Sequence, residues 1–210
     1  MSGQRRLIIG VAIAAGTAML TYFLPLFHVV PLGDSGQNGI FEPRAFIDRF
    51  WAEKLIPASA RAVDASELVT ALYEDRQSAR EAHSRSVGLG GVYYYFVTGT
   101  GRVVSVEKNS IGLAVRDGLD EVEVSLETGP IFGNAVRDGT GLLDVNDFPN
   151  SQDFNALSSE INGRVEEQVL PTLRTVAVGA SVRFAGCAEV MDEETDLRPL
   201  RVVPFIAEVQ

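Results

Sequence analysis

The segment 129–150 contains the polar residue types that recognise sugar hydroxyl groups. Planar Asp, Asn and Arg side chains can bridge neighbouring hydroxyls, and an aromatic ring can pack against the face of a sugar. A structural alternative is that Arg137 pairs with Asp138 or Asp147 and fixes a long loop. Five residues of this segment are therefore our candidates for binding a ligand or a partner: Arg137, Asp138, Asp147, Phe148 and Asn150.

Nucleophilic catalysis has little support in the sequence. Gly33-Asp34-Ser35-Gly36 resembles the nucleophile turn of trypsin-like proteases, but that chemistry needs a histidine base and a buried carboxylate. His28 lies in an apolar run, and His83 has no supporting pattern around it. The single cysteine, Cys187, stands in a strand-like stretch, which is typical of a small buried thiol. We expect no catalytic residue and interpret 33–36 as part of a linker.

The sequence gives equally little support for a metal or cofactor site. Asp144, Asp147 and Asp153 could offer oxygens to Ca²⁺, but their spacing does not match an EF-hand loop and also suits solvated, helix-capping acids. Gly99-Thr100-Gly101 lacks the Lys-Ser/Thr of a phosphate-binding loop, so small residues there are better explained by crowding at a bend of a sheet. We expect no metal and no cofactor.

The charge of the chain argues against nucleic acid as a partner. The formal net charge is −10, and because Arg5 and Arg6 are the only charges before Asp34, the rest carries 16 basic and 28 acidic side chains, a charge of −12. Such a surface repels phosphate groups and anionic lipid head groups.

The stretch from Leu7 to Val30 predicts a membrane anchor. Its 24 residues contain no acid and no permanent base. As a helix they would extend about 36 Å, enough to cross a hydrocarbon core of about 30 Å. Arg5 and Arg6 precede the run, which places residues 1–6 in the cytoplasm and the remainder in the periplasm of a bacterial-type cell.

A cleaved signal peptide is the alternative to a retained anchor. The apolar core of a signal peptide is usually about 7–15 residues and is followed by a site of small residues. The run at 7–30 is longer, and its end at His28–Leu32 offers no such site. We therefore predict a single-pass inner-membrane protein.

Two amphipathic helices follow a polar linker at 31–42. Pro43 suits the first turn of a helix whose apolar residues recur at helical spacing up to Leu55, and we expect this helix to stop before Pro57. Asp64 and Glu67 have the spacing of a capping box that opens a second helix reaching about Ser84. We therefore predict a helical segment over 43–90.

Residues 91–210 predict a small closed sheet. Runs of β-branched, aromatic or alternating residues indicate five strands, and Leu157, Ile161, Val165 and Val169 indicate a helix between the third and fourth. In this order the expected elements are Tyr93–Glu107, Ile111–Arg116, Glu121–Glu127, a helix from Asp153 to Leu173, Ser181–Val190 and Leu200–Val209. The order is that of an OB-like β-barrel with one inserted helix, so the predicted fold class is α+β.

Short motifs along most of the chain resemble one bacterial family, the predicted periplasmic lipoproteins of domain of unknown function 2291. They are Leu26-Phe27-His-Val-Val-Pro31-Leu32, Gly99-Thr-Gly101-Arg-Val-Val, Gly129-Pro-Ile-Phe-Gly-Asn-Ala-Val-Arg137-Asp138, Asp147-Phe148-Pro149-Asn150 with Phe154, and Val178-Gly179 with Val182 and Gly186. Members commonly carry a lipid-attachment cysteine near the N-terminus, which this sequence lacks. An uncleaved helix would replace it.

The resemblance implies an accessory role in carbohydrate import, since such proteins tend to be encoded beside sugar ABC transporters. We therefore expect a non-enzymatic binding or accessory component, with a transporter permease or a sugar-binding protein as its partner. A periplasmic hydrolase that acts on saccharides through paired carboxylates is one alternative. A structural protein of the envelope is the other.

Overall fold

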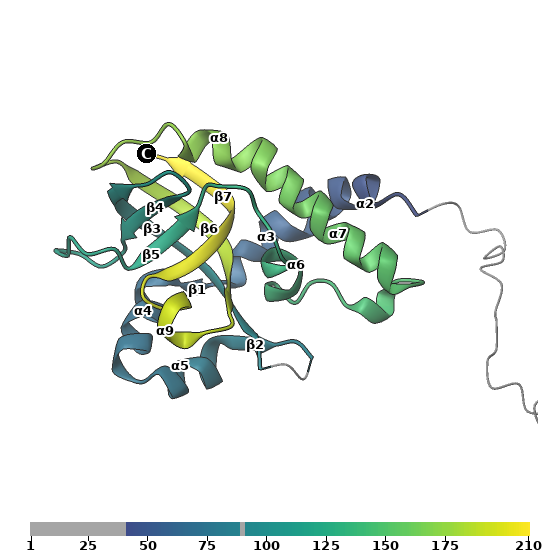
Figure 1. Ribbon diagram of the computed structural model, residues 1–210, viewed down its shortest axis with the longest axis horizontal. Helices are drawn as coiled ribbons and strands as arrows, with labels where there is room; N and C mark the ends of the chain where they lie inside the picture. The colour runs from purple at the N-terminus through teal and green to yellow at the C-terminus, as the bar shows by residue number, and fades with distance from the viewer. Residues whose placement is uncertain (1–40, 89–90) are drawn as a thin grey trace, which may run out of the picture. The chain divides into compact units, whose positions relative to one another are not determined.

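The computed structural model describes residues 41–88 and 91–210, which form an α+β structure, as the sequence predicts (Figure 1). The predicted cytoplasmic tail at 1–6 and membrane anchor at 7–30 lie outside the described residues, as does the linker at 31–42 except for its last two residues. Within the described ranges, no helix combines the length and the apolarity that a membrane crossing requires.

Five strands of the described chain pair in a ring. They are β3 (Tyr93–Val106), β4 (Ser110–Ala114), β5 (Val124–Glu127), β6 (Ser181–Val190) and β7 (Leu200–Val209). β3 pairs antiparallel with both β4 and β6, β4 pairs with β5, β5 runs parallel to β7, and β7 returns to β6. The strands follow the predicted order of three strands, a helix and two strands.

Two short strands that the sequence does not predict extend β3 beyond the ring. β1 (Val63–Asp64) pairs parallel with the middle of β3, and β2 (Ser84–Ser86) pairs antiparallel with its first residues. Both come from the predicted helical segment at 43–90, which therefore also contributes to the sheet. Residues Phe41–Gln210 form one compact unit.

The second predicted helix is two helices. Asp64 accepts hydrogen bonds from the backbone N–H groups of Ser66 and Glu67 at 2.8 and 3.2 Å, as the capping box predicts, and opens α4 (Ala65–Glu74). Asp75 then adopts an extended conformation and caps α5 (Arg76–His83) in the same way. The chain breaks there because a second acid offers the backbone another cap.

α4 packs so closely against β3 that a side chain at Gly99 would require a neighbour to shift. A Cβ atom at Gly99 would lie 3.0 Å from the Cβ of Ala65. The opposite face of β3 packs against α6 (Ala135–Gly139). Covered on both faces, Tyr93, Tyr94 and Tyr95 are all at most 5% exposed, although they are consecutive in the strand.

The first predicted helix does not stop before Pro57. α2 (Pro43–Phe50) runs into a π-helical turn, η1 (Trp51–Leu55), and Pro57 lies in the first turn of α3 (Ile56–Ala58). The π turn has a wider hydrogen-bond spacing, which shifts the backbone hydrogen bonds of the helix just before Pro57. Proline has no N–H group, but a residue in the first turn of a helix needs none.

The helix between the third and fourth ring strands repeats this arrangement. α7 (Ser151–Arg164) continues as the π turn η4 (Val165–Val169), and Pro171 lies in the first turn of α8 (Leu170–Leu173). Figure 1 shows α7 and α8 as one long rod beside the sheet. The predicted helix from Asp153 to Leu173 is therefore confirmed, with a change of ladder near its end.

The third ring strand is shorter than its alternating sequence predicts. Val124 and Leu126 are fully buried, but Val122 lies before β5 and is only half-buried. Glu123 is 2% exposed, and the cost of burying its charge is offset because its carboxylate accepts hydrogen bonds from the backbone N–H groups of Val115 and Arg116 and pairs with the Arg116 guanidinium. A buried acid therefore takes part in closing the β4–β5 connection.

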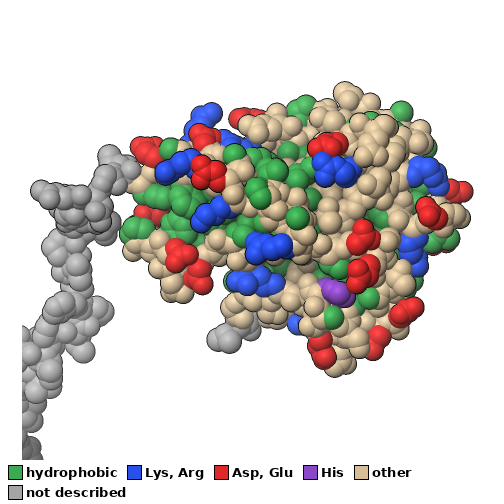
Figure 2. Space-filling model, turned by 180° about the vertical axis from the view of Figure 1, so that it is seen from behind, with side chains coloured by type: hydrophobic (Ala, Val, Ile, Leu, Met, Phe, Trp, Pro, Cys, Tyr) green, Lys and Arg blue, Asp and Glu red, His purple; other side chains and the backbone are tan. Residues whose placement is uncertain are grey.

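Charges of both signs are distributed over the face drawn in Figure 2, where acidic and basic side chains are interspersed. Such mixing, together with the net negative charge, favours solubility over recognition of a polyanion.

Candidate functional site

Two of the five candidate residues lie together in α6, a short helix that the sequence pattern does not predict. Asn134 precedes it, and its backbone carbonyl accepts the N–H of Asp138 at 2.9 Å. The Ser158 hydroxyl of α7 donates to the Asn134 side chain at 2.7 Å. This contact joins α6 to the long helix and places Arg137 and Asp138 between that helix and the sheet.

Arg137 and Asp138 form a bidentate ion pair. The Arg137 Nε and Nη2 atoms donate to the two carboxylate oxygens of Asp138 at 2.7 and 3.0 Å, and the side chains are 7% and 9% exposed. Nη1 donates to Asn155 at 3.1 Å, and the guanidinium lies 4.2 Å from the ring centre of Phe154. Planar contacts of this kind hold arginine more rigidly than a single bond.

The pair lines a hollow of about 330 Å³, which we call the Arg137 hollow. Phe154, Asp144 and Asn146 also line it. Asp144 accepts a hydrogen bond from the Asn146 side chain at 2.7 Å, so these two lining residues are joined to each other. The site therefore combines donors, acceptors and an aromatic ring.

β2 supplies a further cation to the Arg137 hollow. Arg85 is exposed and lies against the backbone at Gly141, where a Cβ atom would come within 2.9 Å of its Nη1. Gly141 also has a φ of +66°, which side chains rarely adopt. A glycine at this position lets the guanidinium approach the loop after α6.

The other three candidates do not line the Arg137 hollow. Asp147 is exposed at the end of η3 (Val145–Asp147), and Asn150 caps α7 by accepting the N–H of Asp153 at 2.8 Å. The Phe148 ring packs in an aromatic cluster, with ring centres 5.4 to 5.7 Å from those of Phe41, Phe46 and Phe154. The structure therefore divides the five candidates into a buried pair, an exposed acid, a helix cap and a half-buried aromatic residue packed against the core.

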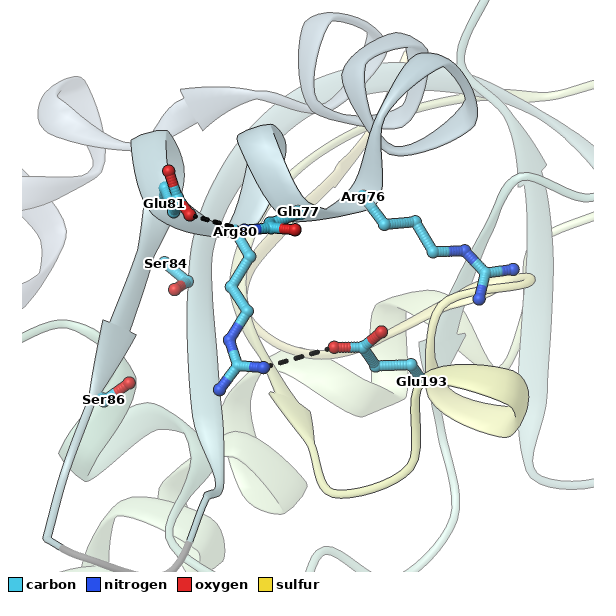
Figure 3. Close-up of a pocket in the computed structure, with 7 residues that line it drawn as sticks. All are labelled: Arg76, Gln77, Arg80, Glu81, Ser84, Ser86 and Glu193. Carbon is cyan, nitrogen blue, oxygen red and sulfur yellow. Dashed lines mark hydrogen bonds and ion pairs between the residues drawn. The ribbon is translucent and has the colours of Figure 1, made fainter.

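A second and larger hollow, the Arg80 hollow, lies on the other side of β2. It measures about 670 Å³, and Figure 3 shows Arg76 and Arg80 of α5 extending into it with Glu193 opposite. Arg80 pairs with Glu193 at 3.4 Å, and Arg76 pairs with Glu194 at 2.8 Å. Each arginine therefore already has a carboxylate partner.

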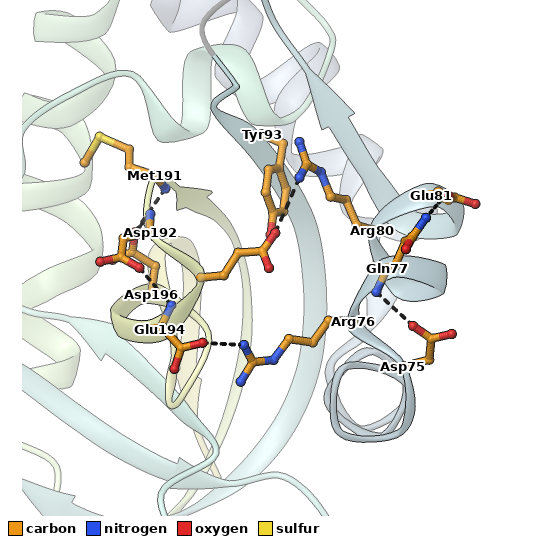
Figure 4. A network of polar contacts seen from close by, with 11 residues as sticks. Asp75, Arg76, Gln77, Arg80, Glu81, Tyr93, Met191, Asp192, Glu194 and Asp196 are labelled. Atoms are coloured by element: carbon orange, nitrogen blue, oxygen red, sulfur yellow. Dashed lines mark hydrogen bonds and ion pairs between the residues drawn. The ribbon is translucent and has the colours of Figure 1, made fainter.

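The Arg80 hollow is lined by residues of a polar network that joins α5 to α9 (Glu193–Asp196). Tyr93 donates its hydroxyl to Glu193 at 2.9 Å, and Arg80 lies 4.1 Å from the centre of the Tyr93 ring (Figure 4). Burial and the contact with Glu193 raise the pKa of Tyr93. The hydroxyl therefore stays protonated and can donate. The network holds α5 and β3 against α9.

Cys187 is a buried thiol, as its sequence context predicts. It is fully buried in β6, and burial raises the pKa of the thiol. The thiolate needed for nucleophilic attack is therefore disfavoured at neutral pH.

The chain is similar to a solved structure, the crystal structure of an OB-fold protein from Thermotoga maritima, with 27% sequence identity and a TM-score of 0.71. The similarity covers 81% of this chain and 99% of the other. None of the curated proteins matches the sequence.

The family comparison covers nearly the whole chain. Residues 17–208 match the family described as predicted periplasmic lipoprotein, domain of unknown function 2291. The match includes α6, the Arg137 hollow and the ring strands, except for the last residue of β7. The chain thus belongs to this family of predicted periplasmic lipoproteins.

Proposed function

We propose that the protein is a membrane-tethered, non-enzymatic binding component of the periplasm that takes a saccharide in the Arg137 hollow. It would serve a carbohydrate ABC transport system. The observation that carries the proposal is the buried Arg137–Asp138 pair, stacked on Phe154, at the wall of a hollow of about 330 Å³. A hollow of this size suits a small sugar.

The chemistry of the wall supports a saccharide over a purely charged ligand. Asp138 and Asp144 offer acceptors, Asn146 offers both a donor and an acceptor, and Arg85 offers donors. Sugar hydroxyls need both kinds of partner at once. Arg85, Asp144 and Asn146 all line the same hollow, so the hydroxyls of one sugar could bond to donors and acceptors together.

Binding without turnover is favoured by the state of Asp138. Both of its carboxylate oxygens accept hydrogen bonds from Arg137. A carboxylate engaged in this way is suited to hold a fixed geometry rather than to exchange a proton with a glycosidic oxygen. The family description supports a periplasmic location, and a retained apolar helix at 7–30 would supply the tether.

The binding proposal is tested by titration calorimetry of the full chain in detergent with glucose, galactose, ribose and xylose. Arg85→Ala removes an exposed donor from the hollow and should weaken the binding of the accepted sugar by about tenfold or more. Arg183→Ala removes an arginine on β6 that pairs with Glu208, and should leave the affinity unchanged. Equal sugar affinities of the two variants would contradict binding in the Arg137 hollow.

The absence of turnover is tested on the same samples. A disaccharide incubated with the full chain should be recovered intact by chromatography. Release of monosaccharide that Asp138→Asn abolishes would instead establish the hydrolase alternative.

The transport role has its own experiment, which is affinity purification of the full chain from detergent-solubilised membranes followed by mass spectrometry. Recovery of a sugar transporter permease or its sugar-binding protein would support the role. Recovery of this chain alone would oppose a stable transporter complex while leaving the binding proposal to calorimetry.

A further inference from the structure

Two apolar side chains stand out on the surface beside β6 and β7. Phe132 is 80% exposed and Met191 is 74% exposed, the two highest values for large apolar residues in the described chain. Both line a hollow of about 290 Å³ whose floor includes Val203. We call this region the Phe132 surface; its remaining side chains include Glu189, Asp196 and Arg201.

The loop that carries Phe132 is fixed from both sides. Ile131, one residue earlier, is 5% exposed, and its N–H donates to the Glu166 carboxylate at 2.7 Å. The carbonyl of Gly133, one residue later, accepts from the Asn162 amide at 3.1 Å. Both partners belong to the long helix α7–η4. Phe132 is therefore exposed on a loop whose backbone is fixed by hydrogen bonds on both sides.

Met191 is held in a similar way. Its N–H donates to the Asp196 carboxylate at 3.0 Å, and the next N–H, that of Asp192, donates to the same oxygen at 2.9 Å (Figure 4). Asp196 is 7% exposed. Apolar groups on a backbone that is already ordered lose little conformational entropy when they bind a partner.

The hollow between these apolar groups has an excess of negative charge. Arg201 already pairs with Glu127 at 2.8 Å and lies 3.6 Å from Asp196. Glu189 is half-buried, and one of its oxygens accepts from the Tyr94 hydroxyl at 3.1 Å. Against three acids there is one arginine, so a cation would complement the hollow.

We propose that the Phe132 surface docks a protein partner that inserts a Lys or Arg side chain toward Glu189 while its apolar neighbours pack on Phe132 and Met191. The charge excludes anionic lipid as the occupant, because the acidic wall repels it. The proposal stands apart from the saccharide: it holds whether or not the Arg137 hollow binds a sugar. A few anchor residues, often aromatic or arginine, carry most of the binding energy of a protein interface, so a held aromatic residue beside a half-buried acid suits a partner that brings a cation.

The test uses the full chain in detergent and two fluorescein-labelled peptides, one of alternating Leu and Arg and one of alternating Leu and Glu. Fluorescence anisotropy should show binding of the arginine peptide and none of the glutamate peptide. Phe132→Ser should weaken the binding of the arginine peptide by at least about tenfold. Glu189→Gln keeps an acceptor for Tyr94 but removes the charge, and should also weaken binding.

Val178→Ser is the matched control, because Val178 is a 62% exposed apolar residue that does not line the hollow. It should bind the arginine peptide like the unaltered protein. Equal binding of the two peptides, or no effect of Phe132→Ser, would overturn the proposal. Sedimentation that shows a dimer converted to a monomer by Phe132→Ser would overturn it as well, since the surface would then join two copies of this chain.

Discussion

Neighbouring tyrosines of β3 differ in how their hydroxyls are satisfied. Tyr94 donates to Glu189 at 3.1 Å, whereas the Tyr95 hydroxyl is buried without a hydrogen-bond partner in the described part of the chain. Burial also raises the pKa of Tyr95 to about 12. A buried hydroxyl without a partner costs free energy, whereas a bonded one contributes to stability.

Replacing each tyrosine by phenylalanine separates these two states. Tyr94→Phe should lower the free energy of unfolding by about 1–2 kcal/mol, because Glu189 loses its donor. Tyr95→Phe should leave it unchanged or raise it by up to about 1 kcal/mol. Urea denaturation measures both values. A larger loss for Tyr95→Phe than for Tyr94→Phe would show that the Tyr95 hydroxyl has a partner.

Asp75 gives a pH-dependent prediction at the same scale. Hydrogen bonds from the Ser78 hydroxyl and the Ser78 backbone N–H hold the pKa of Asp75 below its ordinary value. Because the folded-state pKa is the lower one, the stabilisation is complete above the unfolded-state pKa and is lost as the pH falls through the folded-state pKa.

The measurement for Asp75 is a carbon-13 NMR titration of its carboxyl group. The midpoint should lie below the ordinary value of 3.8 and should move up in Ser78→Ala. A midpoint that Ser78→Ala leaves in place would assign the lowered pKa to another cause.

The candidate residues were only partly predictable from the sequence. Adjacent Arg137 and Asp138 suggest a pair, and Asn150 followed by Asp153 has the spacing of a helix cap. The groups that complete the hollow could not be found in this way. Arg85 is brought to the site by strand pairing and Phe154 by helix packing, and neither contact leaves a local sequence signal.

At the scale of elements, proline does not end the helices that contain it. Pro171 follows the π turn η4 and stands in the first turn of α8, where its missing N–H removes no bond. Pro171→Ala should therefore change the free energy of unfolding by less than about 1 kcal/mol. Ser159→Pro, in the middle of α7, is the sensitivity control and should cost about 3 kcal/mol or more.

Chemical denaturation of the two proline variants decides between a tolerated and a strained helix. A gain of about 3 kcal/mol in Pro171→Ala would mean that the native proline breaks a hydrogen bond after all.

Long elements with a strong pattern were predictable, and short ones were not. The bounds of β6 and β7 agree with the prediction because both strands are long and bordered by turn residues or acids. β1, β2 and α6 have two to five residues each, and their conformations depend on β3 and the long helix. Pro57 misled the prediction since a π turn cannot be recognised from spacing alone.

At the scale of the whole molecule, we propose that a membrane helix tethers the folded periplasmic unit. The family describes lipoproteins, yet the single cysteine of this sequence is buried in β6. We therefore expect the apolar run at 7–30 to hold the protein in the membrane, more firmly than one acyl chain would.

Alkaline carbonate extraction of membranes tests this tether. The full chain should stay in the membrane pellet, whereas a variant that lacks residues 7–30 should move to the supernatant. Release of the full chain by carbonate would contradict a spanning helix and favour a cleaved or peripheral form.

The central claim is that the protein binds a saccharide beside the Arg137–Asp138 pair, and amide chemical-shift mapping tests it most directly. The full chain in detergent, labelled with nitrogen-15, is titrated with glucose, galactose, ribose and xylose in turn. The account predicts that one of these sugars shifts the amides of Arg85, Asp138, Asn146 and Phe154. Shifts confined to the Arg80 hollow, or none with any of the sugars, would contradict it.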